Sequence, residues 1–281
     1  MRHHDIDGLH VAEWGPEDGP VIVTTHGITS SHLVWQWVAA AAPELRIVAL
    51  DLRGRGGSST LPGPWGLERH AADVVHVLDA LGFDSVPLMG HSMGGFVANI
   101  VTSLYPERVS SVLLVDGGLT LPFPPGFSLE NRTAVIGRAV DRLAMTFETP
   151  EEYRAFWREH LALVNDWSPL VEAYVDFDLV GKRSRTSAEA VGQDVIELYG
   201  TPVLEAAIAA IRPETTMLVA PRGMVDEIPG LYPPERMEQW AAELPALNVV
   251  HVPDTNHYTI AMSHRGAAIV AEHARLLSRR T

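Results

Sequence analysis

A serine in a short glycine-rich segment is the clearest candidate for chemistry in this chain. The segment reads Gly90-His91-Ser92-Met93-Gly94 and stands between the apolar run Val86–Met89 and a helical pattern over 93–104. A strand that passes directly into a helix forces a sharp turn, which exposes a serine hydroxyl at its tip. The glycines at positions 90 and 94 let neighbouring backbone approach closely. We therefore predict that Ser92 is a nucleophile.

A serine hydroxyl becomes a good nucleophile only when a base accepts its proton, and histidine does this near neutral pH. The chain has 13 histidines. His257 follows the last predicted strand in a turn with Asn256, and it comes last in the chain order serine, acid, histidine. We interpret His91 as structural, because its side chain should point away from the pocket. His3 and His4 fall in a terminus that we expect to be mobile. His257 is therefore the predicted base.

These two residues need a scaffold, and the remaining pattern indicates which one. Short β-branched or aliphatic runs alternate with longer helical patterns, which is typical of a mostly parallel sheet covered by helices. The predicted strands are Leu9–Trp14, Val21–Thr25, Arg46–Leu50, Val86–Met89, Val112–Val115, Thr216–Val219 and Val249–Val252. The predicted helices in this part cover 67–81, 93–104, 234–243 and 264–278. The fold class is therefore predicted as α/β, with a doubly wound, mostly parallel sheet.

The segment 118–212 interrupts this alternation. It opens with LPFPPGF at 121–127, which is too rich in proline for a helix or a central strand. Helical patterns follow over 131–147, 150–164, 168–180 and 188–211, with no convincing strand among them. We predict a core domain formed by 1–117 and 213–281, and a helical lid (cap) formed by 118–212. Its aromatic residues predict a mainly apolar pocket, with Trp157 and Trp167 as substrate contacts.

Together with the serine segment, three further motifs resemble the α/β-hydrolase superfamily over almost the whole chain. Thr25-His26-Gly27-Ile28 ends an early strand, where that family places its oxyanion-hole loop. Asp51–Ser58 (DLRGRGGS) resembles the family's D-x-R-G-x-G-x-S turn. Asn256-His257 follows the last strand, where the family keeps its catalytic histidine. The resemblance implies that the backbone N–H groups of Ile28 and Met93 form the oxyanion hole.

The acid that orients the histidine has several candidates. Asp226 lies in Gly223-Met224-Val225-Asp226 and resembles the family's G-x-x-D acid loop. Asp116 directly ends the strand Val112–Val115, from which some branches of the family take their acid, and Glu227 is a third candidate. Chain order favours Asp226 over Asp116. This assignment predicts a carboxylate of Asp226 within about 3.2 Å of the His257 nitrogen that faces away from the serine.

The composition of the chain restricts the kinds of partner that it can be expected to bind. A formal net charge of −14 argues against nucleic acid, whose phosphates would be repelled. The absence of cysteine excludes disulfides and thiolate chemistry, and no metal-ligand spacing stands out, so no metal and no cofactor are expected. The sequence has no apolar leader and no run of 18 apolar residues, which predicts a cytoplasmic protein without a membrane partner. Association of identical chains stays open.

The predicted activity is that of a cofactor-free serine hydrolase. Its substrate is expected to be a carboxylic ester or lactone of small to medium apolar character, cleaved through an acyl-enzyme. The same residues would serve a thioesterase or a hydrolase of carbon–carbon bonds beside a ketone, so these stay alternatives. An epoxide hydrolase or dehalogenase is disfavoured, because those branches of the family carry aspartate where this chain has Ser92. A small-molecule receptor of the same fold, with little turnover, is a further alternative.

Overall fold

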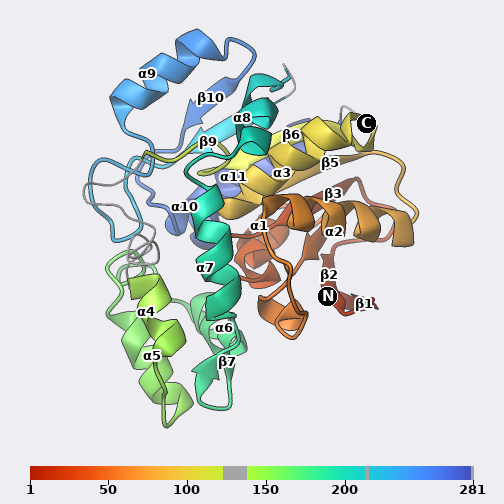
Figure 1. Ribbon diagram of the computed structural model, residues 1–281. Coiled ribbons are helices and arrows are strands. Elements are labelled where there is room, and N and C mark those ends of the chain that lie inside the picture. Colours follow the sequence, from red (N-terminus) through yellow and green to blue (C-terminus); the bar gives the residue numbers. More distant parts are fainter. Residues whose placement is uncertain (123–137, 213–214, 280–281) are drawn as a thin grey trace.

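An eight-stranded sheet forms the centre of the computed structural model, which describes residues 1–122, 138–212 and 215–279 (Figure 1). The strand order is β1-β2-β4-β3-β5-β6-β9-β10. The β1–β2 and β2–β4 pairs are antiparallel, and every other pair in this sheet is parallel. The predicted, mostly parallel α/β sheet is therefore confirmed.

The strands agree closely with those predicted, apart from one addition at the amino end. Their bounds are β1 Arg2–Ile6, β2 Leu9–Trp14, β3 Val21–Thr25, β4 Arg46–Leu50, β5 Val86–His91, β6 Val109–Val115, β9 Thr215–Val219 and β10 Asn248–His251. The added strand β1 pairs with β2 along its whole length, with His3 opposite Ala12 and His4 opposite Val11. The expectation that these two histidines lie in a mobile terminus is therefore wrong, because both belong to a paired edge strand.

Helices cover both faces of the sheet, because successive side chains of each strand point to opposite sides. On β6, Val112 and Leu114 pack toward one face, whereas Leu113 and Val115 pack toward the other. The first face is covered by α2 (Leu67–Ala80), α3 (Met93–Leu104) and α9 (Pro234–Glu243). The second is covered by α1 (Gln36–Ala41), α10 (Thr259–Met262) and α11 (His264–Ser278). Three short 3-10 helices lie in loops: η1 (His32–Trp35), η2 (Gly56–Ser58) and η3 (Pro106–Arg108).

Between β6 and β9 the described chain is mainly helical (Figure 1). It forms α4 (Arg138–Ala144), α5 (Pro150–Arg158), α6 (Pro169–Asp178), α7 (Ala188–Glu197) and α8 (Pro202–Ala209). Part of the helix expected over 131–147 lies outside the described residues. The single helix expected over 188–211 is two helices, because Gly200 adopts a φ of 123° and Thr201 caps the helix that Pro202 begins. A small hairpin of β7 (Leu179–Val180) and β8 (Arg183–Ser184) was not expected.

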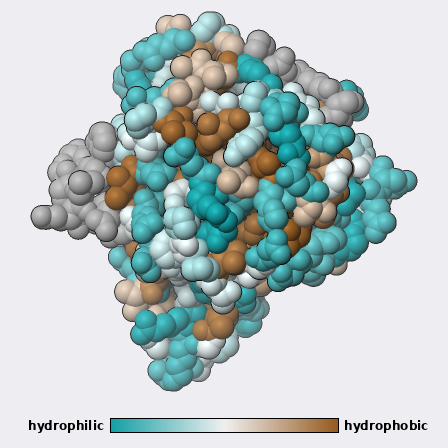
Figure 2. Space-filling model, turned by 45° about the vertical axis from the view of Figure 1, so that its right-hand side comes forward, coloured by the Kyte–Doolittle hydropathy of each residue, from teal (hydrophilic) through white to brown (hydrophobic). Residues whose placement is uncertain are grey.

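The surface shown in Figure 2 mixes hydrophilic and hydrophobic residues. Hydrophobic residues occur there in small groups among hydrophilic ones, as on most protein surfaces. None of the helices in the described part of the chain combines the length and the apolar character that crossing a membrane requires.

Candidate active site

Ser92 lies in the turn between β5 and α3, as the sequence predicted. Its backbone has a φ of 54° and a ψ of −127°, a strained conformation for a residue with a side chain. Close backbone packing fixes this turn: a Cβ atom on Gly94 would lie 2.5 Å from the carbonyl carbon of Thr25, and one on Gly90 would meet the backbone of Gly94. Gly90 and Gly94 thus allow the close backbone contacts that the sequence predicted. Packing against β3 and α3 maintains the strained conformation of Ser92.

His257 lies next to this serine. Its Nε2 atom is 3.0 Å from the Ser92 Oγ, and its Nδ1 atom is 2.7 Å from Oδ2 of Asp116. The ring is almost wholly buried, with 4% of its surface exposed. Because a carboxylate only accepts hydrogen bonds, Nδ1 carries the proton, and Nε2 is left free to accept the serine proton. Serine, histidine and aspartate thus form one continuous hydrogen-bonded chain.

The expected bond between Asp226 and His257 is wrong, because both ring nitrogens of His257 are taken by Asp116 and Ser92. Asp116 follows β6 directly, and β6 lies next to β5, which carries the serine. The carboxylate of Asp116 is fully buried, and its second oxygen accepts the backbone N–H of Ala220 at 3.1 Å. The loop that carries Asp226 also reaches this region, since the His257 N–H bonds to the Gly223 carbonyl at 3.4 Å, but the Asp226 carboxylate is bonded to other side chains.

The two carboxylates of the loop after β9 have other hydrogen-bond partners. Asp226 accepts hydrogen bonds from Arg222 Nε at 2.7 Å and from Asn256 Nδ2 at 2.8 Å. These bonds hold the pKa of Asp226 below its ordinary value, although burial acts in the opposite direction. The third candidate, Glu227, accepts the backbone N–H of Val225 at 2.7 Å. Both carboxylates therefore serve the geometry of this loop.

The proposed oxyanion donors flank the serine. Met93 is the first residue of α3, so its N–H has no partner within the helix and lies at the positive end of the helix dipole. The loop that carries Ile28 packs against the nucleophile, since a Cβ atom on Gly27 would lie 3.2 Å from the Cβ of Ser92 and 3.5 Å from its Oγ. This arrangement is compatible with two backbone donors for an oxyanion beside the serine.

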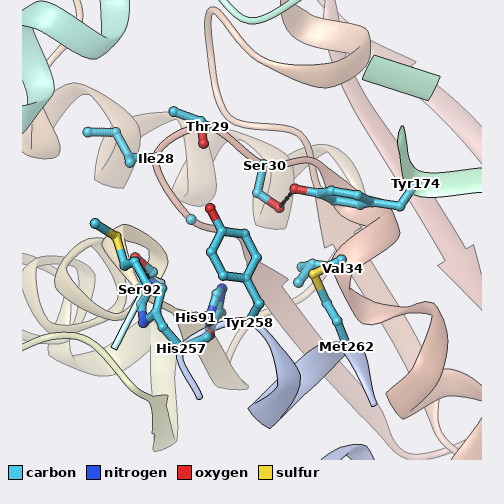
Figure 3. Close-up of a pocket in the computed structure, with 12 residues that line it drawn as sticks. Ile28, Thr29, Ser30, Val34, His91, Ser92, Tyr174, His257, Tyr258 and Met262 are labelled. Atoms are coloured by element: carbon cyan, nitrogen blue, oxygen red, sulfur yellow. Dashed lines mark hydrogen bonds between the residues drawn. The ribbon is translucent and has the colours of Figure 1, made fainter. Parts of the chain in front are cut away.

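Two cavities adjoin Ser92 and His257. The larger, of about 230 Å³, is lined mainly by apolar residues, among them Phe96, Leu121, Val195, Leu198, Tyr199 and Leu231. The smaller, of about 30 Å³, is lined by Ile28, Thr29, Ser30, Tyr174, Tyr258 and Met262 together with the serine and histidine (Figure 3). Sequence reasoning missed Ser30 and Tyr258, although each lies within two residues of a predicted site residue.

Trp157 and Trp167 do not line either of these two cavities, so their expected role as substrate contacts is not supported. Trp157 is buried in an aromatic cluster, edge-on to Tyr174 and to Tyr258 at centroid distances of 6.4 and 6.3 Å. Trp167 lies beneath the guanidinium of Arg158, 5.0 Å from it. These tryptophans pack the helices together, and residues from α6 and α7 reach the cavities in their place.

Two buried histidines beside the site are held neutral. His91 donates from Nε2 to the carbonyl of His257 at 2.8 Å, and burial together with the neighbouring His257 ring lowers its pKa to about 3. His26 donates to the Gly27 carbonyl at 2.8 Å and accepts the N–H of Leu52 at 3.0 Å. Burial lowers its pKa to about 4. Both rings thus fix backbone around the serine without adding positive charge, in agreement with the structural role predicted for His91.

One cluster in the described chain has the composition of a metal site. The ligand atoms of His10, His32 and Asp51 lie within 4.8 Å of one another. However, Oδ2 of Asp51 already accepts hydrogen bonds from both histidine Nδ1 atoms at 2.8 Å and from the N–H of Gly57 at 2.7 Å. Burial would raise the pKa of this carboxyl, but the adjacent imidazoles hold it well below its usual range. The cluster is satisfied as a hydrogen-bonded network that ties β2 to two loops.

Comparison with known proteins places this geometry in context. The sequence profile described as the alpha/beta hydrolase fold matches residues 20–163. Lipase LipV of Mycobacterium tuberculosis is 34% identical over 116 residues, which are 41% of this chain and 44% of the lipase. Epoxide hydrolase B of the same organism is 34% identical over 121 residues, 41% of this chain and 33% of that protein. The matches thus span less than half the length of these curated relatives.

Solved structures extend the likeness over the whole chain. A crystal structure of E-2-(acetamidomethylene)succinate hydrolase covers 98% of this chain, and 97% of its own chain is covered, with a TM-score of 0.77 and 22% identity. A thermophilic esterase from Thermogutta terrifontis covers 99% of this chain, and all of its own chain is covered, with a TM-score of 0.71 and 23% identity. At these identities the likeness establishes the shared fold.

Proposed function

The chain belongs to the alpha/beta hydrolase fold family, and on that premise we propose that it is a serine hydrolase of carboxylic esters or lactones of small to medium apolar character. The observation that carries the proposal is the chain of bonds from Ser92 through His257 to Asp116, at 3.0 and 2.7 Å. An apolar cavity of about 230 Å³ next to Ser92 supports an apolar substrate. The similarity to a lipase supports an ester bond as the target.

In the proposed reaction, Ser92 attacks the acyl carbon while His257 accepts the serine proton at Nε2. Asp116 keeps the proton on Nδ1 and stabilises the imidazolium that forms. The backbone N–H groups of Ile28 and Met93 stabilise the negative charge of the tetrahedral intermediate. His257 then gives its proton to the leaving alcohol, and the acyl-enzyme is hydrolysed by a water that His257 activates in the same way. We propose that the helices between β6 and β9 act as the lid of this site.

The alternative functions differ from an esterase in their substrate, in their nucleophile or in their turnover. A thioesterase or a carbon–carbon bond hydrolase would use the same three residues, and substrate choice alone separates them from an esterase. An epoxide hydrolase is disfavoured despite the similarity to one, because Ser92 stands where that branch carries aspartate. A receptor of the same fold would bind ligand with negligible turnover, whereas the aligned hydrogen bonds at His257 favour turnover.

Covalent labelling of the native protein tests the nucleophile. A fluorophosphonate probe should label Ser92, and a p-nitrophenyl ester of a short fatty acid should be hydrolysed. The Ser92→Ala variant should take up no label and lose on the order of 10⁴-fold or more in kcat, with an unchanged melting temperature. A control variant, Ser110→Ala, should behave like the unmodified protein. Labelling at another serine, or persistent activity of Ser92→Ala, would contradict the proposal.

A further inference from the structure

Several hydroxyl-bearing side chains line the smaller cavity beside Ser92. In the larger cavity, aliphatic and aromatic side chains dominate the lining. Besides Ser92, the smaller cavity has the hydroxyl-bearing residues Thr29, Ser30, Tyr174 and Tyr258 in its wall (Figure 3). Its volume of about 30 Å³ suits one or two heavy atoms of a ligand. Thus both cavities have mainly apolar walls, and the smaller one, here called the compartment, presents a group of hydroxyls next to the nucleophile.

Tyr258 is held with its hydroxyl facing this compartment. The side chain is 8% exposed, and its ring packs edge-on against His160, His257 and Trp157 at centroid distances of 5.1, 5.9 and 6.3 Å. Figure 3 shows the hydroxyl directed toward the Thr29–Ser30 loop. The contacts of the described residues give this hydroxyl no hydrogen-bond partner, so a buried donor is presented to whatever occupies the cavity.

The hydroxyl groups of Tyr174 and Ser30 add a second donor. Tyr174 donates to Ser30 Oγ at 3.1 Å, which leaves the proton of the serine free to point into the cavity. Burial raises the pKa of both Tyr174 and Tyr258, so both phenols are protonated at neutral pH. The compartment therefore offers two donors, from Ser30 and Tyr258, and favours a ligand atom that accepts hydrogen bonds.

The charge around the compartment favours an uncharged acceptor. Among its lining residues there is no aspartate, glutamate, lysine or arginine. The guanidinium of Arg142 lies behind this wall, where it donates to the carbonyl of Thr29 at 2.7 Å and pairs with Asp178 at 3.2 Å. Because these two opposite charges compensate each other, a carboxylate in the compartment would gain no unpaired cation.

We infer that Tyr258 and Ser30 form a binding site for an uncharged carbonyl oxygen of the substrate, a second carbonyl placed two or three bonds from the scissile one. The inference rests on the proposed function and narrows its substrate class to keto-substituted esters whose apolar part fills the larger cavity. The ketone can belong to the acyl or to the alcohol part, since both parts flank the serine. Tyr258 is thus a specificity-determining residue rather than a member of the hydrogen-bonded chain at His257.

Two pairs of isosteric esters test this site. On the alcohol side, acetonyl hexanoate is compared with isobutyl hexanoate; on the acyl side, hexyl acetoacetate is compared with hexyl isovalerate. Within each pair, the C=O group of the keto ester is replaced by a CH–CH₃ group of similar size. The ratio of kcat/KM within each pair is measured for the unmodified protein, for Tyr258→Phe and for the distant control Tyr105→Phe. Intrinsic reactivity cancels when the ratios are compared between proteins.

For at least one pair, the keto-to-isostere ratio should fall about tenfold in Tyr258→Phe, since one buried hydrogen bond is lost, while Tyr105→Phe keeps the original ratio. The affected pair identifies the side on which the ketone lies. Equal ratios in all three proteins for both pairs would overturn the inference and leave the proposed function standing. If the unmodified protein hydrolysed none of the four esters, the proposed function would fail instead. The affinities of the same ester pairs would then be measured for Ser92→Ala and for the double variant Ser92→Ala/Tyr258→Phe. The same keto-to-isostere affinity ratio in both variants, or no binding at all, would overturn the inference.

Discussion

Replacing Asp116 by asparagine should nearly abolish activity without unfolding the protein. The carboxylate accepts two hydrogen bonds, from His257 Nδ1 at 2.7 Å and from the Ala220 N–H at 3.1 Å. An asparagine that keeps its oxygen on Ala220 turns its NH₂ group toward Nδ1. The imidazole must then carry its proton on Nε2, where it can no longer accept the proton of Ser92. By comparison with serine proteases, this wrong tautomer costs on the order of 10⁴-fold in kcat, or about 5 kcal/mol.

Asp226→Asn is the matched substitution, because it makes the same chemical change in the rival carboxylate. The side chain of Asp226 is 35% exposed and is bonded to Arg222 and Asn256 rather than to His257. The asparagine retains an acceptor oxygen for one of these partners. We expect kcat to change by less than about threefold and the free energy of unfolding by at most about 1 kcal/mol, as for other exposed ion pairs.

The assay is the kcat of both variants on one p-nitrophenyl ester, with circular dichroism and urea unfolding to verify that each is folded. A severe defect in Asp226→Asn beside a mild one in Asp116→Asn would refute the reasoning and restore the acid that chain order favours.

Two further predictions concern stability. The pKa of His91 is lowered to about 3 and that of His26 to about 4, so below pH 6.5 the unfolded chain binds two protons that the folded chain refuses. As the pH decreases from 6 to 4, the free energy of unfolding should therefore fall by up to about 2.7 kcal/mol per pH unit. Urea unfolding of His91→Gln at several pH values should show about half of this pH dependence. An equal pH dependence in the two proteins would contradict the assignment. Gly94→Ala should prevent stable folding, because its Cβ would collide with the Thr25 carbonyl. Thermal melts test this, and a melting temperature close to that of the unmodified protein would contradict the expected collision.

The parts of this structure that were predictable from sequence depend on local pattern. The buried strands β2, β3 and β4 have the bounds that their apolar runs indicated, and the turn at Ser92 follows from a strand, two glycines and a helix in immediate succession. His257 was likewise identified because it follows the last strand of the sheet. In each case, side chains within a few residues of one another determine the conformation, so no long-range contact had to be known.

The errors concern contacts between segments that are distant in sequence. Asp116 and Asp226 both follow a strand, and the bonds of Asp226 to Arg222 and Asn256 leave Asp116 as the partner of His257. Trp157 was expected at the substrate because it is aromatic and lies between β6 and β9. Its burial among other rings follows from how α5 and α6 pack, which the sequence does not indicate. β1 was missed because its alternation of exposed and half-buried residues contains two histidines and an arginine.

The position of Asp116 has a consequence for how this protein can diverge. All three residues of the hydrogen-bonded chain at His257 lie outside the segment 224–232, which contributes Met224, Glu227, Gly230 and Leu231 to the wall of the larger cavity. This part of the cavity wall can therefore change in sequence without altering the three side chains of the hydrogen-bonded chain. A library that randomises Met224 and Leu231, or changes the length of the loop between them, should yield enzymes with altered acyl preference and an intact nucleophile. In related chains whose catalytic acid lies in this loop, most variants of the same library would be inactive.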